Sequence, residues 1–135
     1  MLTGGCLCGA CRFEYCGAVG AASYCHCADC RRATGSAFNV GVRIAPAEFG
    51  MVQGTPAVFT NTGDSGRALS RHFCSDCGSP LFTSSLAHPD WTFVKAGALD
   101  DPTLVKPEYE SWTSSEVPWA RPSLGLVRYA RGREA

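Results

Sequence analysis

Nine cysteines in a chain of 135 residues are the feature that most constrains this fold. Such density is typical either of a disulfide framework or of a set of metal ligands. The odd number, the tight C-x-C and C-x2-C spacing, and the lack of a charged and then apolar leader favour reduced, metal-binding thiols. We therefore expect a cytoplasmic metalloprotein. The cysteines are Cys6, Cys8, Cys11, Cys16, Cys25, Cys27, Cys30, Cys74 and Cys77.

The charge and hydropathy of the chain argue against two classes of partner. Twelve basic residues balance twelve acidic residues, so no excess of positive charge attracts nucleic acid. The apolar runs, of which Leu81-Phe82 is an example, are far too short to span a bilayer. We expect neither a nucleic-acid partner nor a membrane partner, and a protein that is a monomer or a homodimer.

Fifteen glycines and eight prolines separate short apolar or alternating runs, a pattern that predicts a mainly β protein with little helix. One domain over residues 1–135 is the simplest organisation. A short helix is expected at Ala28–Ala33, and Asp64-Ser65-Gly66 is expected to turn between the strands of a hairpin. We expect the polar end, Arg128–Ala135, to be loose. The predicted strands are Ala10–Tyr15, Ala37–Ile44, Ala57–Thr60, Leu69–Phe73, Leu81–Ser84 and Thr92–Ala96.

Two distant cysteine pairs predict a closed zinc site. Residues i and i+2 of an extended chain face the same side, so Cys6 and Cys8 can direct both sulfurs to one point. Cys74 and Cys77 lie on a turn, and the glycine that follows tolerates the positive φ that such a turn often needs. Four thiolates are the usual ligand set of a structural zinc. The alternative is four buried thiols without a ligand.

The central cluster, Cys25, Cys27 and Cys30, differs because it offers only three thiolates. Three protein ligands leave a fourth position open, as in catalytic zinc sites. His26 would point away from its neighbours in an extended chain, so we interpret it as an outward-facing or hydrogen-bonding residue rather than a ligand. Arg31 and Arg32 follow the cluster either as a solvated surface pair or as a clamp for an anionic substrate.

Two cysteines remain outside these groups. A free cysteine is most often a small buried apolar residue, and we interpret Cys11 and Cys16 in this way. Cys16 is also the nearest thiol that could complete the central cluster as a fourth ligand.

Five motifs in this order resemble the glutathione-dependent formaldehyde-activating enzyme family, which also includes centromere protein V. The motifs are GGCLCGACRFEY, YCHCADCRRATGSAF, HFCSDCGSPLF, AGALDDP and WTSSEVPW, and the resemblance spans residues 4 to 119. It implies a β-tent fold of antiparallel sheets that meet around zinc. It also implies a structural zinc on Cys6, Cys8, Cys74 and Cys77 and a catalytic zinc on Cys25, Cys27 and Cys30.

The family's activity is condensation of formaldehyde with glutathione to S-hydroxymethylglutathione, formally a carbon–sulfur lyase reaction in reverse. An open metal position suits this reaction because coordination lowers the pKa of a thiol. Arg31 or Arg32 could hold a glutathione carboxylate. Glu110 stands where family members often have a histidine, so it is a further candidate for substrate contact. Trp112 and Trp119 are interpreted as core or pocket-wall residues.

Two alternatives remain. A binding module with two structural zincs would need a fourth protein ligand at the central cluster, with Cys16 as the candidate. A related enzyme could act on a different thiol or a different small electrophile.

Overall fold

Two β-sheets make up most of the computed structural model, which describes residues 1–63, 66–121 and 125–133. The smaller sheet has three antiparallel strands in the order β1-β2-β5. Its strands are β1 (Leu2–Gly5), β2 (Arg12–Tyr15) and β5 (Phe49–Gln53). The larger sheet has the order β11-β10-β3-β4-β9-β8-β7-β6. Its strands are β3 (Ala22–Cys25), β4 (Asn39–Ile44), β6 (Ala57–Thr62), β7 (Ala68–Phe73), β8 (Pro80–Ser85), β9 (Thr92–Lys95), β10 (Pro107–Ser111) and β11 (Val127–Arg128).

Helical structure is scarce in the described residues, so the prediction of a mainly β protein is confirmed. Helix α1 (Ala28–Thr34) begins after Cys27 and ends at Gly35, whose φ of 71° suits a glycine. None of the helices in residues 1–63, 66–121 and 125–133 is long and apolar enough to cross a membrane. The 3-10 turns within the described residues are η1 (Pro46–Glu48), η2 (Ala96–Ala98), η3 (Pro102–Leu104) and η4 (Thr113–Ser115).

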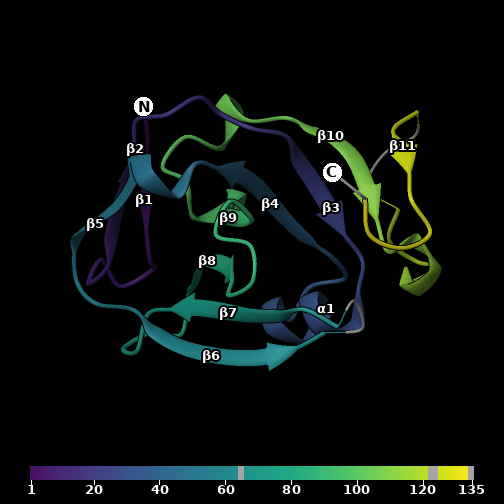
Figure 1. Ribbon diagram of the computed structural model, residues 1–135, viewed down its shortest axis with the longest axis horizontal. Helices are drawn as coiled ribbons and strands as arrows, with labels where there is room; N and C mark the ends of the chain where they lie inside the picture. Colours follow the sequence, from purple (N-terminus) through teal and green to yellow (C-terminus); the bar gives the residue numbers. More distant parts are fainter. Residues whose placement is uncertain (64–65, 122–124, 134–135) are drawn as a thin grey trace.

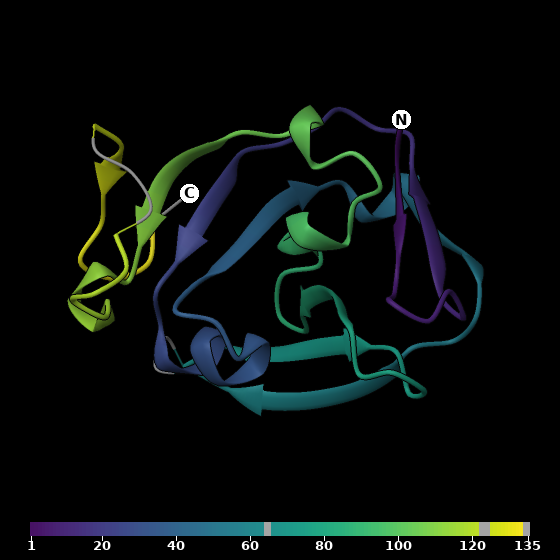
Figure 2. The same ribbon diagram turned by 180° about the vertical axis from the view of Figure 1, so that it is seen from behind.

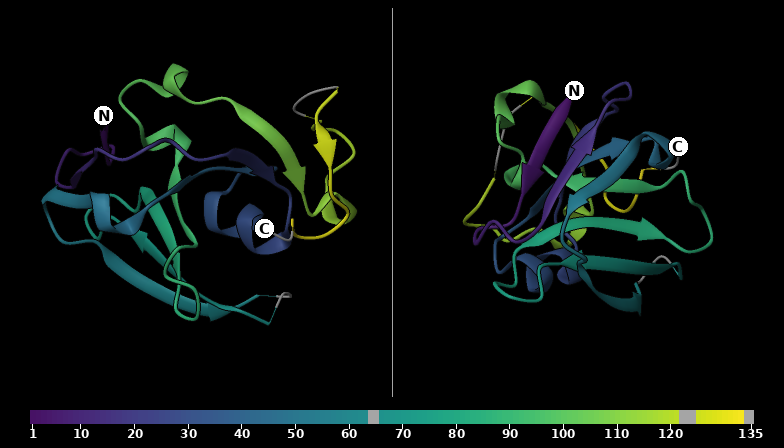
Figure 3. Two further views of the ribbon diagram at one scale, coloured as in Figure 1. Left: turned by 45° about the horizontal axis from the view of Figure 1, so that its top comes forward. Right: turned by 90° about the vertical axis from the view of Figure 1, so that its left-hand side faces the viewer.

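The larger sheet is strongly curved, so that its two halves face each other (Figure 1). Strands β3 and β4 lie on one side, β7 and β6 lie on the other, and α1 lies between them (Figures 1 and 2). The smaller sheet lies at the opposite end of the molecule from β10 and β11. The same arrangement is visible when the molecule is turned (Figure 3). The fold therefore surrounds α1 and the cysteines next to it with strands.

The hydrophobic core joins the two sheets. Phe13 and Tyr15 of β2 alternate with exposed Glu14, as a half-buried strand requires. They pack in one cluster with Ile44 of β4 and Leu81 of β8. This cluster also contains Leu2, Cys11, Cys74, Val94 and Leu99. One of the predicted metal-binding cysteines therefore belongs to the core itself.

The predicted strands correspond to β2, β4, β6, β7, β8 and β9, with ends that differ by a few residues. Strands β6 and β7 form the predicted antiparallel hairpin, and the first two residues of its turn, Asp64 and Ser65, lie outside the described residues. The prediction of a loose end is wrong for residues 128–131, whose backbone pairs with residues 110–114. Arg128 belongs to β11, and the backbone N–H of Tyr129 donates to the carbonyl of Glu110 (2.8 Å).

Candidate metal centres and the adjoining cleft

The four cysteines predicted to form a closed site lie together. Their sulfur atoms are all within 4.8 Å of one another, as a shared metal ion would require: Cys6, Cys8, Cys74 and Cys77. The loop between β1 and β2 supplies two of them, and the turn between β7 and β8 supplies the other two. Sulfur separations of 3.6 Å for Cys6–Cys8 and 3.8 Å for Cys8–Cys74 mark the centre of the group.

Backbone hydrogen bonds shape both halves of this group. The N–H of Cys11 donates to the Cys6 sulfur (3.2 Å) and lowers the pKa of that thiol. Gly78 has a φ of 77° and closes the second turn by donating its N–H to the Cys74 carbonyl (2.8 Å). The Ser79 hydroxyl lies 3.2 Å from the Cys77 sulfur and lowers its pKa to about 5. These contacts favour thiolates, the form in which cysteine binds metal.

The three central cysteines also lie together, with sulfur atoms within 4.8 Å of one another. Cys25 ends β3, Cys27 caps the N-terminus of α1, and Cys30 lies in the first turn of that helix. The Cys30 N–H donates to the Cys27 sulfur at 3.3 Å. Cys30 is buried, whereas Cys25 and Cys27 are partly exposed, so a small molecule can approach the group from their side.

The mutual influence of the three thiols on their pKa values favours a cation at this group. Contacts with the Cys27 and Cys30 thiols lower the pKa of Cys25 to about 3. The same contacts raise the pKa of Cys30, chiefly because of Cys25. The three sulfurs thus hold one negative charge easily, but they do not easily hold a second or a third negative charge. A bound divalent cation would remove this conflict, and three thiolates are a ligand set that zinc accepts.

A cleft of about 490 Å³ lies between α1 and strands β6 to β8. Its lining carries three cations, Arg32, Arg71 and Lys95, against one carboxylate, Asp29. Asp29 accepts from the Asn61 amide (3.1 Å) and lies 3.9 Å from Arg71, contacts that fasten α1 to β6 and β7. The cleft is therefore positively charged next to the helix that carries Cys30.

The two candidate arginines have different positions. Arg32 is exposed and lines the cleft. Arg31 is not among the residues that line it, and its Nε is buried without a hydrogen-bond partner in the described part of the chain. Of the pair, Arg32 is the one placed to meet a ligand in the cleft.

Lys95 is a functional candidate that the sequence reasoning missed. It is 8% exposed, and its ammonium donates to the Asn39 side chain at 2.8 Å. Burial lowers its pKa, whereas Cys30 and the other two central cysteines act in the opposite direction. A lone lysine between apolar residues, in Val94-Lys95-Ala96, is the signal that could have identified it, because buried lysines need a partner.

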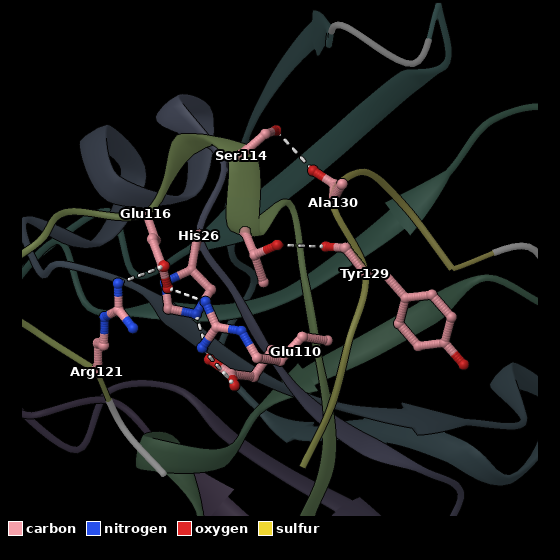
Figure 4. Close-up of polar contacts among 9 residues, drawn as sticks. His26, Glu110, Ser114, Glu116, Arg121, Tyr129 and Ala130 are labelled. Carbon is pink, nitrogen blue, oxygen red and sulfur yellow. Dashed lines mark hydrogen bonds and ion pairs between the residues drawn. The ribbon is translucent and has the colours of Figure 1, made fainter. Parts of the chain in front are cut away.

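His26 and Glu110 lie on the other side of β3 and β10 from the cluster. Both are fully buried, and His26 Nε2 lies 2.9 Å from Glu110 Oε1 (Figure 4). His26 is thus hydrogen-bonded as predicted but does not face outward, since the C-terminal residues cover it. Glu110, a candidate for substrate contact, is enclosed in this pair. His26, Glu110 and Glu116 also meet the spacing of metal ligands, but Arg128 contacts both carboxylates, so we interpret the group as an ion-pair network.

Four further residues of the sequence analysis have clear positions. Cys11 is buried in the core, as predicted. Cys16 is exposed, so its interpretation as a buried apolar residue is wrong. Its thiol lies 3.6 Å from the Glu48 carbonyl, and it joins neither cysteine group of the described residues. Trp112 is partly buried and lies under the Arg131 guanidinium at 4.7 Å. Trp119 is 78% exposed, so its interpretation as a core or pocket-wall residue is wrong.

Comparison with known proteins gives one family and one informative structure. The sequence model described as "Glutathione-dependent formaldehyde-activating enzyme" matches residues 1–115. A crystal structure of a Rhodobacter sphaeroides protein superposes with a TM-score of 0.59 at 20% identity. The superposition covers 94% of this chain and 98% of that one, and at this identity it shows a shared fold. None of the curated proteins matches the sequence.

Proposed function

Because the chain belongs to the glutathione-dependent formaldehyde-activating enzyme family, we propose that it is a zinc-dependent enzyme that adds glutathione to formaldehyde or a related small aldehyde. The observation that carries the proposal is a three-cysteine cluster at the N-terminus of α1, the helix whose Asp29, Arg32 and Ala33 line a cleft with three cations. In this proposal Cys25, Cys27 and Cys30 hold the zinc of the reaction site. A second, structural zinc is held by Cys6, Cys8, Cys74 and Cys77.

The residues around the cluster hold its three sulfurs in place. A zinc ion bound there supplies the positive charge that lowers the pKa of a thiol substrate from about 8.5. The Ser111 side chain supports the ionised form of Cys25, and the Cys30 N–H fixes the sulfur of Cys27. Partial exposure of Cys25 and Cys27 leaves a path by which the substrate sulfur can approach.

The cleft suits an anionic substrate of small size. Its volume, about 490 Å³, falls in the usual range for small-molecule sites, about 300–1,000 Å³. Arg32 presents an exposed guanidinium, and Lys95 presents an ammonium that is shielded from water. Glutathione carries two carboxylates, and charge-assisted hydrogen bonds to these cations would orient it with its sulfur towards the cluster.

The proposed reaction balances without an oxidant or a second cofactor. The substrate sulfur forms a bond to the carbonyl carbon of the aldehyde, and the carbon–oxygen π pair moves to oxygen. The proton that the thiol loses is returned to that oxygen, which gives the S-hydroxymethyl product. The role of Lys95 here is electrostatic, because its positive charge favours negative charge on a nearby sulfur or oxygen.

The test measures acceleration of a reaction that also occurs without catalyst. NMR exchange spectroscopy on mixtures of glutathione and formaldehyde gives the interconversion rate with and without zinc-loaded protein. We expect faster exchange with wild type, and the loss of this acceleration in Cys30→Ser together with one zinc per chain. Cys16→Ser is the matched control, since Cys16 is exposed and belongs to neither group.

Three results would count against the proposal. A protein with two zincs that neither accelerates exchange nor binds glutathione at millimolar concentration would not be this enzyme. Acceleration only with another thiol would favour the related enzyme that acts on a different substrate. A second zinc lost in Cys16→Ser would favour a binding module in which Cys16 completes the central site.

A further inference from the structure

An ion-pair network that begins at a fully buried histidine–carboxylate pair lies directly behind the three-cysteine cluster. His26, between Cys25 and Cys27 in the sequence, is 0% exposed, and so is Glu110. His26 Nε2 and Glu110 Oε1 are 2.9 Å apart, and Arg128 donates to Glu110 Oε2 at 3.1 Å (Figure 4). The histidine, the carboxylate and the guanidinium therefore form one continuous chain of contacts.

The position of Arg128 is set by strand pairing. Strand β11 runs parallel to β10, and its register places Arg128 opposite Glu110. The next residues are fastened as well, because the N–H groups of Thr113 and Ser114 donate to the carbonyls of Tyr129 (3.0 Å) and Ala130 (3.1 Å). The C-terminal segment 127–131 thus acts as a strap across the end of β10.

Glu116 extends the network on its exposed side. Arg128 lies 2.6 Å from one Glu116 oxygen, and Arg121 lies 3.6 Å from the other. Glu116 is 13% exposed and Arg121 is 61% exposed, so the network passes from the buried pair to solvent. Arg128 bridges the two carboxylates and is the central member of the network.

We infer that Arg128 is a positioning residue, which holds the His26–Glu110 pair and so fixes Cys25 and Cys27 in the orientation that binds metal. Side chains alternate along an extended chain, so anchoring His26 on one face directs its two neighbours to the other. The His26 backbone is held too, because its N–H donates to the Ser111 carbonyl at 3.0 Å. Residues that hold the ligands of a metal site in place commonly tune the affinity of the site for its metal in this way.

Electrostatics explains why the arginine matters. A buried carboxylate that loses its cation is strongly unfavourable, so the surrounding structure shifts to let water in or to neutralise it. Here the direct partner of that carboxylate is His26, so any adjustment around Glu110 acts on the residue that joins Cys25 to Cys27. The four-cysteine group contains none of these residues and serves as an internal control. The inference rests on the metal site proposed above, and Arg128 lies beyond the matched residues 1–115.

The experiment measures cobalt binding at each site separately. Cobalt(II) bound to thiolates absorbs in the near-ultraviolet and visible range, and the spectrum of Cys30→Ser identifies the four-cysteine site. Titration against a chelator then gives one affinity per site. We expect Arg128→Met to weaken the three-cysteine site by about 10- to 100-fold and to leave the four-cysteine site unchanged. Arg128→Lys should recover part of the affinity.

The matched control is Arg133→Met, which removes an exposed cation that lies two residues beyond the strap and over the Tyr109 ring at 4.6 Å. It should leave both sites unchanged. Equal affinity at the three-cysteine site in wild type and Arg128→Met would overturn the inference. If Arg128→Met loses both metals, Glu110→Gln is the deciding variant, because it breaks the network without leaving a buried charge. Weaker cobalt binding at the three-cysteine site alone would support the inference. Wild-type cobalt affinity at that site would overturn it.

The two proposals can fail separately. A wild-type protein that binds two cobalt ions but does not accelerate the exchange of glutathione and formaldehyde would refute the proposed function and leave the role of Arg128 intact. A wild-type protein that binds a single cobalt ion would overturn both.

Discussion

Lys95 lies where its charge can be compensated only by neighbouring groups. Its side chain is largely removed from water, and its one hydrogen bond described in the structure is to a neutral amide, Asn39. Burial of a lysine without a carboxylate partner is unfavourable. The central cysteines offset this cost when they carry negative charge, as their opposing influence on the Lys95 pKa shows. The same ammonium group is available to a substrate anion in the cleft.

This position leads to a test at the level of one side chain. Lys95→Gln keeps a hydrogen-bond donor for Asn39 but removes the charge. We expect the glutathione Kd to rise by about 10- to 100-fold, the usual range for a lost charge-assisted hydrogen bond, while an uncharged thiol such as 2-mercaptoethanol is affected less. Calorimetric titration measures the Kd of both thiols.

The control is Lys106→Gln, at the only other lysine, which is exposed. It should change neither Kd. Equal losses of affinity for both thiols in Lys95→Gln would exclude a role of Lys95 in anion binding.

Spacing along the sequence predicted which cysteines lie together, because side chains two to five positions apart can take only a few positions relative to one another. The Cys25, Cys27 and Cys30 group is of this kind. The His26–Glu110 pair is separated by 84 positions, and no local pattern distinguishes two such residues from a solvated histidine and a solvated glutamate. Only the pairing of β3 with β10 brings them together.

Helix α1 depends on its two ends more than on its seven residues. Its first turn is capped by the side chain of Cys27, a proposed metal ligand, and its last by the backbone N–H of Gly35, which donates to the Arg31 carbonyl at 2.8 Å. A helix this short has little stability of its own. The caps and the contacts of Asp29 therefore hold Cys30 in place.

The C-terminal cap can be tested with two equivalent substitutions. Gly35→Ala and Gly50→Ala each add a methyl group in open space, but only Gly35 has a positive φ. We expect Gly35→Ala to lower the free energy of unfolding by about 1 kcal/mol, the cost of a left-handed conformation for a residue with a Cβ. Gly50→Ala should leave it unchanged or slightly higher. Urea denaturation measures both, and equal midpoints would show that the cap can relax.

Strands with apolar or alternating side chains were predicted, and strands that depend on their neighbours were not. Strand β10 has the sequence PEYES, with two glutamates and an initial proline, and it exists because β3 pairs with it in parallel and buries Glu110 against His26. Strand β1 contains two glycines, which weaken a strand signal. Its position is set by pairing with β2. Long-range pairing of this kind leaves no local trace in the sequence.

On the scale of the whole molecule, the four-cysteine group joins parts that are distant in sequence. It connects the β1–β2 hairpin of the smaller sheet to the β7–β8 turn of the larger sheet, and Cys74 lies in the core between them. The three-cysteine group connects only β3 to the helix that follows it. Loss of metal should therefore have very different consequences at the two groups.

Cys77→Ser should be more destabilising than Cys30→Ser. Loss of a metal that joins two sheets is among the few changes that cost more than about 4 kcal/mol, whereas the central group mainly orders a local segment. We expect thermal unfolding followed by circular dichroism to show a much larger fall in Tm for Cys77→Ser. Cys16→Ser, an exposed cysteine to serine change, controls for the substitution itself. Equal decreases in Tm for the two cluster variants would show that both groups support the fold.

The same difference in sequence separation sets an order of assembly during synthesis on the ribosome. Cys25, Cys27 and Cys30 emerge almost together, so a nascent chain can chelate an ion there while most of its strands are still unmade. The other group is incomplete until Cys77 has left the exit tunnel, and its closure must await the collapse of both sheets, because bringing distant segments together costs entropy that packing repays. If both groups hold zinc as proposed, the three-cysteine group would be filled early and the four-cysteine group late, and a cell short of zinc would be expected to accumulate half-loaded chains that proteases recognise as immature.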